Sequence, residues 1–260
     1  MAELVGSAAL ITGGTTGLGF EIARRFLEEG ASVVLTGRDE TLGAAAEERL
    51  APLGAAKFLR ADAGDPDQAR ASVDQAVALL GGLDILVNNA GVGVQAGVLE
   101  TPLDSYDLVM DVNVRGAFVY AQAAFPHLEA RGGAMLHVAS DAGVMGEDDI
   151  GIYSVSKAAL VMLSNMLAIE GGRRGVRSNA VCPGDTAPGM RHMGPPGHDR
   201  PEDDPEDWIV PPLGRVGLAI DVAEAAVYLC SARAAFVNGV ALLVDGGMRA
   251  GMRTDRPAGP

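Results

Sequence analysis

Tyr153 and Lys157 are the side chains in this sequence best suited to move a proton together. They stand four residues apart in Tyr-Ser-Val-Ser-Lys, a spacing that places both on one face of an α-helix, a single turn apart. A free phenol has a pKa of about 10 and is a poor proton donor near neutral pH. A lysine ammonium beside it stabilises the phenolate and lowers that pKa. The pair predicts acid–base chemistry, although the spacing alone is also typical of an ordinary surface helix.

Ser140 precedes Tyr153 by 13 residues and follows a short apolar run at 134–139. We expect this run to be a strand with the serine at its carboxyl end, the edge of a parallel sheet where ligands bind. A hydroxyl in that position can donate a hydrogen bond to a substrate carbonyl and polarise it. Ser140 is therefore a candidate to act with Tyr153.

A glycine-rich segment, Thr12-Gly-Gly-Thr-Thr-Gly-Leu-Gly19, follows the first expected strand. Its spacing is Gly-x-x-x-Gly-x-Gly, which differs from the commoner Gly-x-Gly-x-x-Gly fingerprint. Glycines let the backbone turn tightly and approach a diphosphate, whose charge then faces the amides at a helix N-terminus. A connection without any ligand is the alternative interpretation, but a place in the first strand–helix turn of such a sheet favours a dinucleotide.

The elements that must position these residues alternate along the chain. Apolar runs predict strands at 7–12, 31–36, 56–61, 83–88, 134–139, 176–181 and 240–244. Helical spacing predicts helices at 17–29, 40–50, 66–80, 103–131, 153–173 and 220–231. The strands are continuously apolar, which means that both of their faces are covered. The pattern predicts an α/β fold, a Rossmann-like doubly wound parallel sheet of about seven strands in a three-layer α/β/α arrangement.

The length suits one domain, which we expect at 1–248, with a polar C-terminal tail at 249–260. The long Pro/Gly/Asp-rich segment at 184–215 interrupts the strand–helix rhythm and is expected to be a lid over a substrate. The formal charge is −14, and Lys57 and Lys157 are the two lysines among 20 basic residues, so nucleic acid and anionic membranes are unexpected partners.

Cys182 and Cys230 lie far apart without ligand-like spacing to histidines, so neither a metal site nor a disulfide is expected. The N-terminus lacks a basic segment followed by an apolar stretch, and no apolar run approaches the roughly 18 residues of a membrane helix. We expect a cytoplasmic protein.

Several motifs occur in one order: Thr12-Gly-x-x-x-Gly-x-Gly19, Asn88-Asn-Ala-Gly91, Asn113, Ser140, Tyr153-x-x-x-Lys157 and Pro183-Gly184. Together they resemble the short-chain dehydrogenase/reductase family, from about residue 5 to Gly247. The resemblance implies hydride transfer between a nicotinamide cofactor and a secondary alcohol or ketone. It also implies catalytic roles for Ser140, Tyr153, Lys157 and Asn113: Tyr153 protonates the developing alkoxide, Lys157 also bonds the nicotinamide ribose, and Asn113 positions a water that passes protons to that lysine.

The resemblance further implies a set of cofactor contacts and an oligomer. The cofactor-binding residues expected from it are Gly13, Thr15, Thr16, Gly17, Leu18, Gly19, Arg38, Asp62, Ala63, Asn89, Ala90, Gly91, Tyr153, Lys157, Pro183, Gly184 and Thr186. Asp62 would take the adenine amino group, unless it instead caps the following helix. The segment at 240–247 resembles the family's subunit-association segment, which implies a homotetramer or, failing that, a homodimer.

The choice of cofactor depends on Gly37 and Arg38, where the second expected strand ends. A carboxylate there would accept both ribose hydroxyls of NAD, whereas an arginine suits the 2′-phosphate of NADP. The sequence therefore favours NADP(H). If Arg38 only covers the adenine face, NAD would serve instead.

Substrate contacts are expected from Asp141–Ile152 and from the 184–215 segment. Apolar surface there comes from Val144, Met145, Met190, Met193 and Trp208. Acidic residues, among them Asp141 and Glu147, accompany them and would repel an acidic carrier protein or a CoA phosphate. We therefore expect a neutral, or else cationic, small molecule. The alternatives are a 3-oxoacyl-thioester reductase, an NAD-linked sugar or diol dehydrogenase, and a nucleotide-sensing protein of the same fold without catalytic activity.

Overall fold

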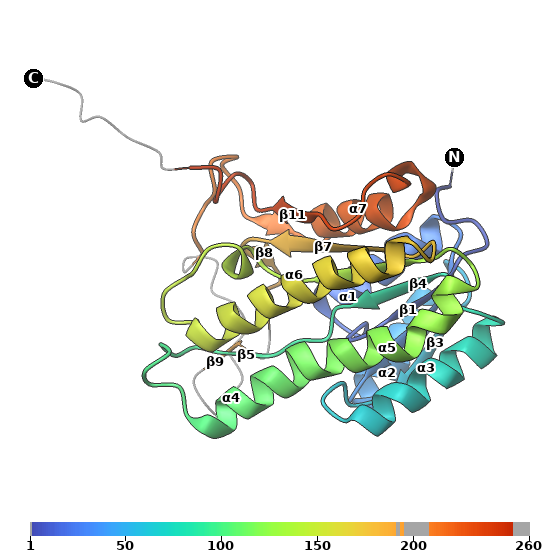
Figure 1. The fold of residues 1–260 in the computed structure, drawn as a ribbon, viewed down its shortest axis with the longest axis horizontal. Helices are drawn as coiled ribbons and strands as arrows, with labels where there is room; N and C mark the ends of the chain where they lie inside the picture. Colours follow the sequence, from blue (N-terminus) through green and yellow to red (C-terminus); the bar gives the residue numbers. More distant parts are fainter. Residues whose placement is uncertain (1, 191–192, 195–207, 252–260) are drawn as a thin grey trace, which may run out of the picture.

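The computed structural model of the chain describes residues 2–190, 193–194 and 208–251, and these form a seven-stranded, wholly parallel sheet (Figure 1). The strand order is β11-β7-β6-β4-β1-β2-β3. From β1 the chain adds β2 and β3 on one side and then β4, β6, β7 and β11 on the other, so the order of the strands reverses between β1 and β4. Ligands bind at this point in such sheets. The strands are β1 (Ala8–Ile11), β2 (Ser32–Gly37), β3 (Ala56–Arg60), β4 (Ile85–Asn88), β6 (Ala134–Val138), β7 (Arg177–Pro183) and β11 (Ala241–Val244).

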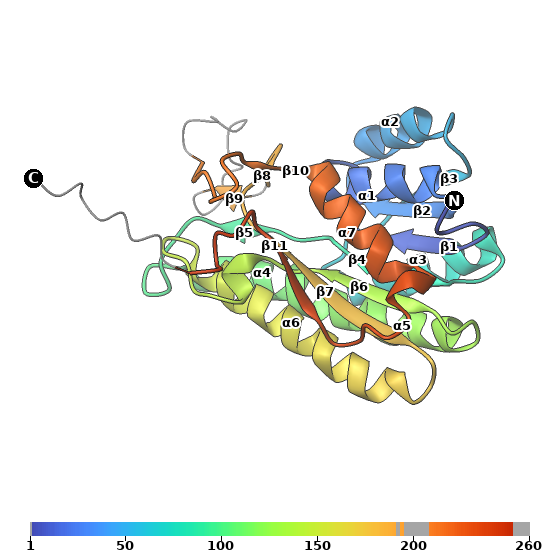
Figure 2. The ribbon, with the colours of Figure 1, turned by 90° about the horizontal axis from the view of Figure 1, so that it is seen from above.

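Helices cover both faces of this sheet, as Figure 2 shows from above. One layer holds α1 (Gly17–Glu28), α2 (Glu40–Leu50) and α7 (Ala219–Cys230). The other holds α3 (Pro66–Leu80), α4 (Leu103–Met110), α5 (Ala117–Glu129) and α6 (Gly151–Gly172). The expected doubly wound, three-layer α/β/α architecture is confirmed.

Each central strand contributes to two cores, which explains why it is continuously apolar. In β1, Ala9 and Ile11 pack into the core beneath α1 and α7, while Leu10 packs into the core beneath α3 and α5. Successive side chains of a strand point to opposite faces, so a strand covered on both sides needs apolar residues at every position.

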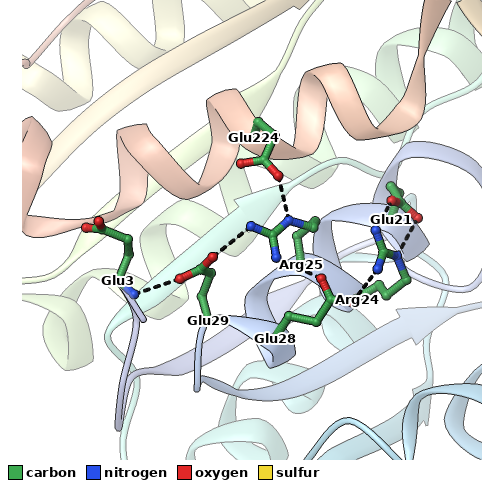
Figure 3. A network of polar contacts seen from close by, with 7 residues as sticks. All are labelled: Glu3, Glu21, Arg24, Arg25, Glu28, Glu29 and Glu224. Atoms are coloured by element: carbon green, nitrogen blue, oxygen red, sulfur yellow. Dashed lines mark hydrogen bonds and ion pairs between the residues drawn. The ribbon is translucent and has the colours of Figure 1, made fainter. Parts of the chain in front are cut away.

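An ion-pair network joins the surfaces of α1 and α7 (Figure 3). Arg25 of α1 donates to Glu224 of α7 at 2.7 Å and also to Glu28 and Glu29 within its own chain segment. Glu29 in turn accepts the backbone amide of Glu3. The network therefore links the N-terminal segment, α1 and α7, which is the neighbour that α1 contacts most extensively.

The helix expected at 103–131 contains a π-helical segment. This segment, Asp111–Gly116, lies between α4 and α5, and the whole run ends at Glu129. The hydrophobic pattern could not reveal it, because one widened turn leaves the residues on either side helical. Such segments are frequent at functional sites, and this one carries Asn113.

The smallest elements were not predicted from the sequence. Four two-residue strands, β5 (Gly93–Val94), β8 (Thr186–Ala187), β9 (Met193–Gly194) and β10 (Gly217–Leu218), pair as β5–β9 and β8–β10. Within the part of the chain that the structure describes, single 3₁₀ turns occupy Asp141–Gly143 and Ala232–Ala234. Two-residue strands are too short to show an alternating pattern, and only tertiary contacts define them.

Helix α6 also begins two residues before the start expected at Tyr153. Among the described helices, it is the one long and apolar enough to cross a membrane by length and composition alone. Its buried side includes Tyr153, Lys157 and Leu160, so α6 is a core helix of this fold.

Candidate active site

The ends of β1 and β4 are joined around the glycine-rich turn. The Thr12 hydroxyl accepts the amides of Asn89 and Ala90, both at 3.0 Å. The Asn89 side chain donates to the carbonyls of Thr12 and Gly13, both at 2.9 Å. Asn89 therefore holds the glycine-rich turn after β1 against the end of β4, in line with its resemblance to the family residue that holds the central strand.

Glycines in the turn are required by close backbone approach. A Cβ on Gly13 would lie 2.8 Å from Cα of Ala90, and one on Gly19 would lie 2.3 Å from the Gly13 carbonyl oxygen. Gly17 has φ +54°, a conformation that favours glycine, and a Cβ there would meet open space. The turn thus leaves an open backbone surface at the N-terminus of α1, which suits a diphosphate.

A pocket of about 360 Å³ extends from this turn to the ends of β6 and β7. Most of the residues expected to bind the cofactor line it, together with Ser140 and two of the expected substrate residues. They are Gly13, Thr15, Thr16, Gly17, Leu18, Arg38, Asp62, Ala63, Asn89, Ala90, Gly91, Ser140, Tyr153, Lys157, Pro183, Gly184, Thr186, Met190 and Trp208. The structure therefore brings the glycine turn and the Tyr153–Lys157 pair to one cavity. Gly19 lies behind the turn and does not line it.

The adenosine side of the pocket has no room for a carboxylate at the end of β2. A Cβ on Gly37 would lie 2.9 Å from Cγ2 of Thr15. Arg38 is exposed at this edge, and its carbonyl accepts a hydrogen bond from Arg60 at 3.2 Å. Two guanidinium groups are thus carried by adjacent strand ends.

Asp62 lies in the pocket and does not cap α3. Its carboxylate accepts the amide of Gly64 at 2.9 Å, whereas the side chain that caps α3 is Asp65. The alternative in which Asp62 serves as the helix cap is therefore wrong.

Ser140, Tyr153 and Lys157 meet at the other end of the pocket. Ser140 follows β6, and Tyr153 and Lys157 come from the first turns of α6, whose N-terminal part lies beside the carboxyl end of β6. Tyr153 is 6% exposed and Lys157 is 1% exposed. The Lys157 ammonium donates to the carbonyl of Val138 at 2.8 Å and lies 5.4 Å from the centre of the Tyr153 ring.

The pKa values of Tyr153 and Lys157 differ from the expectation that Lys157 lowers the pKa of Tyr153. Burial raises the pKa of the Tyr153 phenol above 10, a hydrogen bond with Ser140 lowers it, and the carboxylates of Asp141 and Glu147 raise it further. Burial also lowers the pKa of Lys157 to about 8. The difference arises because both side chains are buried and the lysine donates to the backbone carbonyl of Val138.

The Asn113 side chain is fully engaged by neighbouring protein groups. Its oxygen accepts the amide of Val92 at 2.8 Å, and its nitrogen donates to the Val92 carbonyl and to Ser156. A Cβ on Gly91 would lie 3.4 Å from the Asn113 oxygen and 3.3 Å from the Lys157 nitrogen, so a glycine lies between them. Asn113 thereby fixes the chain after β4 against α6.

The expected substrate residues divide into two groups. Met190 and Trp208 line the pocket. Val144 and Met145 are 50% and 53% exposed and do not line it, because the 3₁₀ turn at 141–143 directs the following residues outward. Met193 belongs to β9 through its backbone, but its side chain lies outside what the structure describes, as do residues 191–192 and 195–207 of the expected 184–215 lid.

One residue of the site gave no signal in the sequence. Arg249, placed by the sequence in a polar tail, has a side chain that is only 15% exposed. It pairs with Asp141 at 2.9 Å and with Glu147 at 2.5 Å. These partners lie about 100 residues earlier in the chain, so no local spacing could have indicated the contact.

Comparisons with known proteins agree with this geometry. A family model described as Enoyl-(Acyl carrier protein) reductase matches residues 13–249. The chain is 38% identical over 243 residues to 2-(S)-hydroxypropyl-CoM dehydrogenase 3 of Xanthobacter autotrophicus, covering 92% of this chain and 95% of that protein. It is 35% identical over 247 residues to D-threitol dehydrogenase of Mycolicibacterium smegmatis, covering 94% of each.

A solved structure shares the fold as well. The short-chain type dehydrogenase/reductase from Mycobacterium marinum matches with a TM-score of 0.84 and 31% identity, covering 96% of this chain and 97% of that one. The chain therefore belongs to the short-chain dehydrogenase/reductase family and is an oxidoreductase that acts on alcohols or ketones with a nicotinamide nucleotide.

Proposed function

We propose that this enzyme interconverts a secondary alcohol and a ketone on a neutral small molecule, with NADP(H) as cofactor and Tyr153 as general acid and base. The observation that carries the proposal is the meeting of Ser140, Tyr153 and Lys157 in the cavity that the glycine turn opens into. The nicotinamide nucleotide supplies or accepts the hydride. The protein must hold the substrate oxygen and move one proton at that atom.

Each of the three residues has a distinct task in this proposal. The Ser140 hydroxyl donates to the substrate oxygen and orients it toward Tyr153. The Tyr153 hydroxyl gives its proton to that oxygen in reduction and removes it in oxidation. Lys157, with a pKa of about 8, exchanges protons near neutral pH, so it can restore the proton that Tyr153 loses. Asn113 supports this arrangement by holding Val92 and Ser156 in place.

The preference for NADP(H) rests on the end of β2. Thr15 occupies the space that an acidic side chain at position 37 would need, and Arg38 stands next to it in the pocket lining. A guanidinium binds a 2′-phosphate through charge-assisted, bidentate hydrogen bonds. Arg60 adds a second positive charge at the neighbouring strand end.

The proposed neutrality of the substrate rests on three carboxylates in the pocket wall. Asp141, Glu147 and Asp185 line the cavity, as do Met190 and Trp208. Negative charge there disfavours a substrate that carries phosphates, such as an acyl-CoA. The relatives named for a hydroxypropyl-CoM and for D-threitol differ in substrate, and in this proposal the residues of this wall select among alcohols.

A homo-oligomer, either a tetramer or a dimer, is part of the proposal. The outer face of α6 exposes Val155, Met162, Met166 and Ile169, whose spacing forms one apolar stripe. In the described sheet, β11 is an edge strand and offers a second surface for a contact between subunits. Cys182 and Cys230 are free thiols, which accords with the proposed cytoplasmic location.

The proposal is tested by following NADPH and NADH absorbance against 2-butanone, acetoin, cyclohexanone and acetoacetyl-CoA. We expect turnover of at least one free ketone with NADPH and a lower kcat/KM with the thioester. Preference for acetoacetyl-CoA would favour the 3-oxoacyl-thioester reductase, preference for NADH would favour an NAD-linked enzyme, and no turnover of any probe would contradict the proposal.

A further inference from the structure

Arg249 is held in a defined position by the turn that follows β11. The Asp245 carboxylate accepts the amide of Gly247 at 2.9 Å and the amide of Arg249 at 2.8 Å. The Met248 amide also donates to the Asp245 carbonyl at 3.1 Å. This compact turn directs the Arg249 side chain back toward the substrate end of the pocket.

The guanidinium of Arg249 bridges two carboxylates from the segment after β6. Nε donates to Asp141 at 2.9 Å, and a terminal nitrogen donates to Glu147 at 2.5 Å. The side chains of Arg249 and Asp141 are 15% and 9% exposed, so this pair is largely shielded from water. Arg249 does not itself line the pocket, whereas both of its partners do.

Asp141 is also in direct contact with the proposed catalytic serine. The Ser140 hydroxyl donates to the second carboxylate oxygen of Asp141 at 3.2 Å and accepts the amide of Ala142 at 3.2 Å. A serine hydroxyl has one proton to donate. A substrate carbonyl and the Asp141 carboxylate therefore compete for it, and the competition is weaker when the charge of Asp141 is balanced by Arg249.

The ion pairs of Arg249 with Asp141 and Glu147 also determine the charge near Tyr153. The ionisable groups next to this tyrosine are Lys157 from its own helix and Asp141 and Glu147 from the 141–150 segment. Around them lie Asp185 near Glu147, Cys182 near Lys157 and Asp141, and Arg249 behind the two acids. Both Asp141 and Glu147 raise the pKa of Tyr153, and Arg249 is their counter-ion.

We propose that Arg249 is a positioning residue of this active site: it holds Asp141 and Glu147 so that the Ser140 hydroxyl remains available to the substrate and excess negative charge beside Tyr153 is balanced. The inference rests on the proposed function, because it assigns Arg249 a role through Ser140 and Tyr153. It adds to the reaction a residue from the last described turn of the chain.

The experiment compares the full chain with Arg249→Met, Arg249→Lys and Asp141→Asn. The kinetic probes are cyclohexanone with NADPH and cyclohexanol with NADP⁺ between pH 7 and 10.5. For Arg249→Met we expect kcat for reduction to fall about tenfold, less than the loss of a direct hydrogen-bond donor causes. The apparent pKa in the pH dependence of the oxidation rate should rise by about 0.5–1 unit, because two uncompensated carboxylates favour the protonated phenol.

The other variants test the direction of this pKa shift. Asp141→Asn removes a negative charge and should lower the apparent pKa of the oxidation rate. Arg249→Lys should recover part of the kcat that Arg249→Met loses. Arg174→Met is the matched control, because Arg174 pairs with Glu129 at the far end of α6, and it should leave the profile unchanged. Superimposable profiles for Arg249→Met and the wild type would overturn the proposal, as would shifts of equal sign in Arg249→Met and Asp141→Asn.

Hydrogen exchange gives a readout that does not depend on turnover. The amides of residues 141–150 should exchange faster in Arg249→Met than in the wild type, and unchanged exchange there would overturn the positioning role. A wild type that turns over neither cyclohexanone nor any of the other free ketones would count against the proposed function, whereas the exchange comparison would still decide whether Arg249 holds this segment.

Discussion

The Lys157 ammonium lies 5.4 Å from the centre of the Tyr153 ring, yet its 2.8 Å hydrogen bond goes to the carbonyl of Val138. The lysine is thus fixed at the end of β6 next to Ser140. With its pKa lowered to about 8 by burial, it can gain and lose a proton in the pH range where the enzyme would work. Lys157 is placed to replenish a proton and to support the end of the strand at the same time.

Tyr153→Phe should reduce kcat for ketone reduction by about 10²–10⁴-fold, because it removes only the hydroxyl that transfers the proton. The dissociation constant for NADPH, measured by fluorescence titration, should change little. Tyr228→Phe on α7 is the matched control and should keep full activity. Equal kcat values for Tyr153→Phe and the wild type would exclude Tyr153 as the general acid.

Arg38→Leu should weaken NADPH binding about tenfold or more, since hydrogen bonds to a charged group contribute about 1.5–3 kcal/mol. The KM for NADH should stay the same, because NADH has no 2′-phosphate. Arg70→Leu removes an exposed arginine of α3 that pairs with Asp67, and it serves as the control for net charge. A parallel loss of NADH affinity in Arg38→Leu would indicate stacking on the adenine instead of phosphate binding.

Gly37→Asp alone should destabilise the protein by about 1–3 kcal/mol, because its Cβ would lie 2.9 Å from Thr15 Cγ2. Combining it with Thr15→Ala removes the clashing atoms and should allow the new carboxylate to accept the ribose hydroxyls of NADH. Thermal unfolding and the ratio of kcat/KM for NADH and NADPH measure the two effects. If the double variant is no more stable than Gly37→Asp, Thr15 is not the obstacle.

Stability should depend on pH through Lys157. Its pKa falls from 10.5 to about 8 on folding, so between these values the unfolded chain binds a proton that the folded chain lacks. The free energy of unfolding contributed by this lysine therefore rises with pH across that window, by up to about 3 kcal/mol. Relative to Lys157→Met, the wild type should gain stability from pH 8 to 10.5 in urea unfolding.

Lys57 offers a matched control for that measurement. It is the other lysine of the chain, it is exposed, and it pairs with Glu47. Lys57→Met should keep the alkaline gain of the wild type. A stability difference between wild type and Lys157→Met that stays constant from pH 8 to 10.5 would show that the folded lysine keeps its ordinary pKa.

Charging the outer face of α6 should dissociate the proposed oligomer. Ile169 is 68% exposed and Met166 is 45% exposed, and Met166→Asp/Ile169→Asp would place two carboxylates in an apolar contact. Light scattering after size-exclusion chromatography should show a smaller species than for the wild type. Leu79→Asp on α3, also at an exposed apolar position, should leave the mass unchanged, and a monomeric wild type would refute the oligomer.

The sequence predicted the sheet and the central residues of the candidate site because their signals are local. Strands buried on both faces are continuously apolar, as in Ala8–Ile11, and the helical spacing of Tyr153 and Lys157 is a property of five consecutive residues. The glycine turn is also local, since the backbone approach to Ala90 excludes a side chain at Gly13.

The features that the sequence did not predict depend on tertiary contacts or on burial. The direction of the Lys157 ammonium toward Val138 and the raised pKa of Tyr153 follow from enclosure, which spacing does not encode. The outward direction of Val144 follows a single 3₁₀ turn. The contact of Arg249 with Asp141 joins residues separated by 108 positions.

The hydrogen-bonded turn at Asp245 has a practical consequence for handling the protein. Because Arg249 reaches the active site from that turn, a purification tag fused after Pro260 would begin 11 residues beyond a side chain that touches Asp141. The N-terminal segment instead lies against α1 through Glu3 and Glu29, outside the pocket lining. Recombinant enzyme for kinetic work is therefore better tagged, or immobilised, through its first residues than through its last.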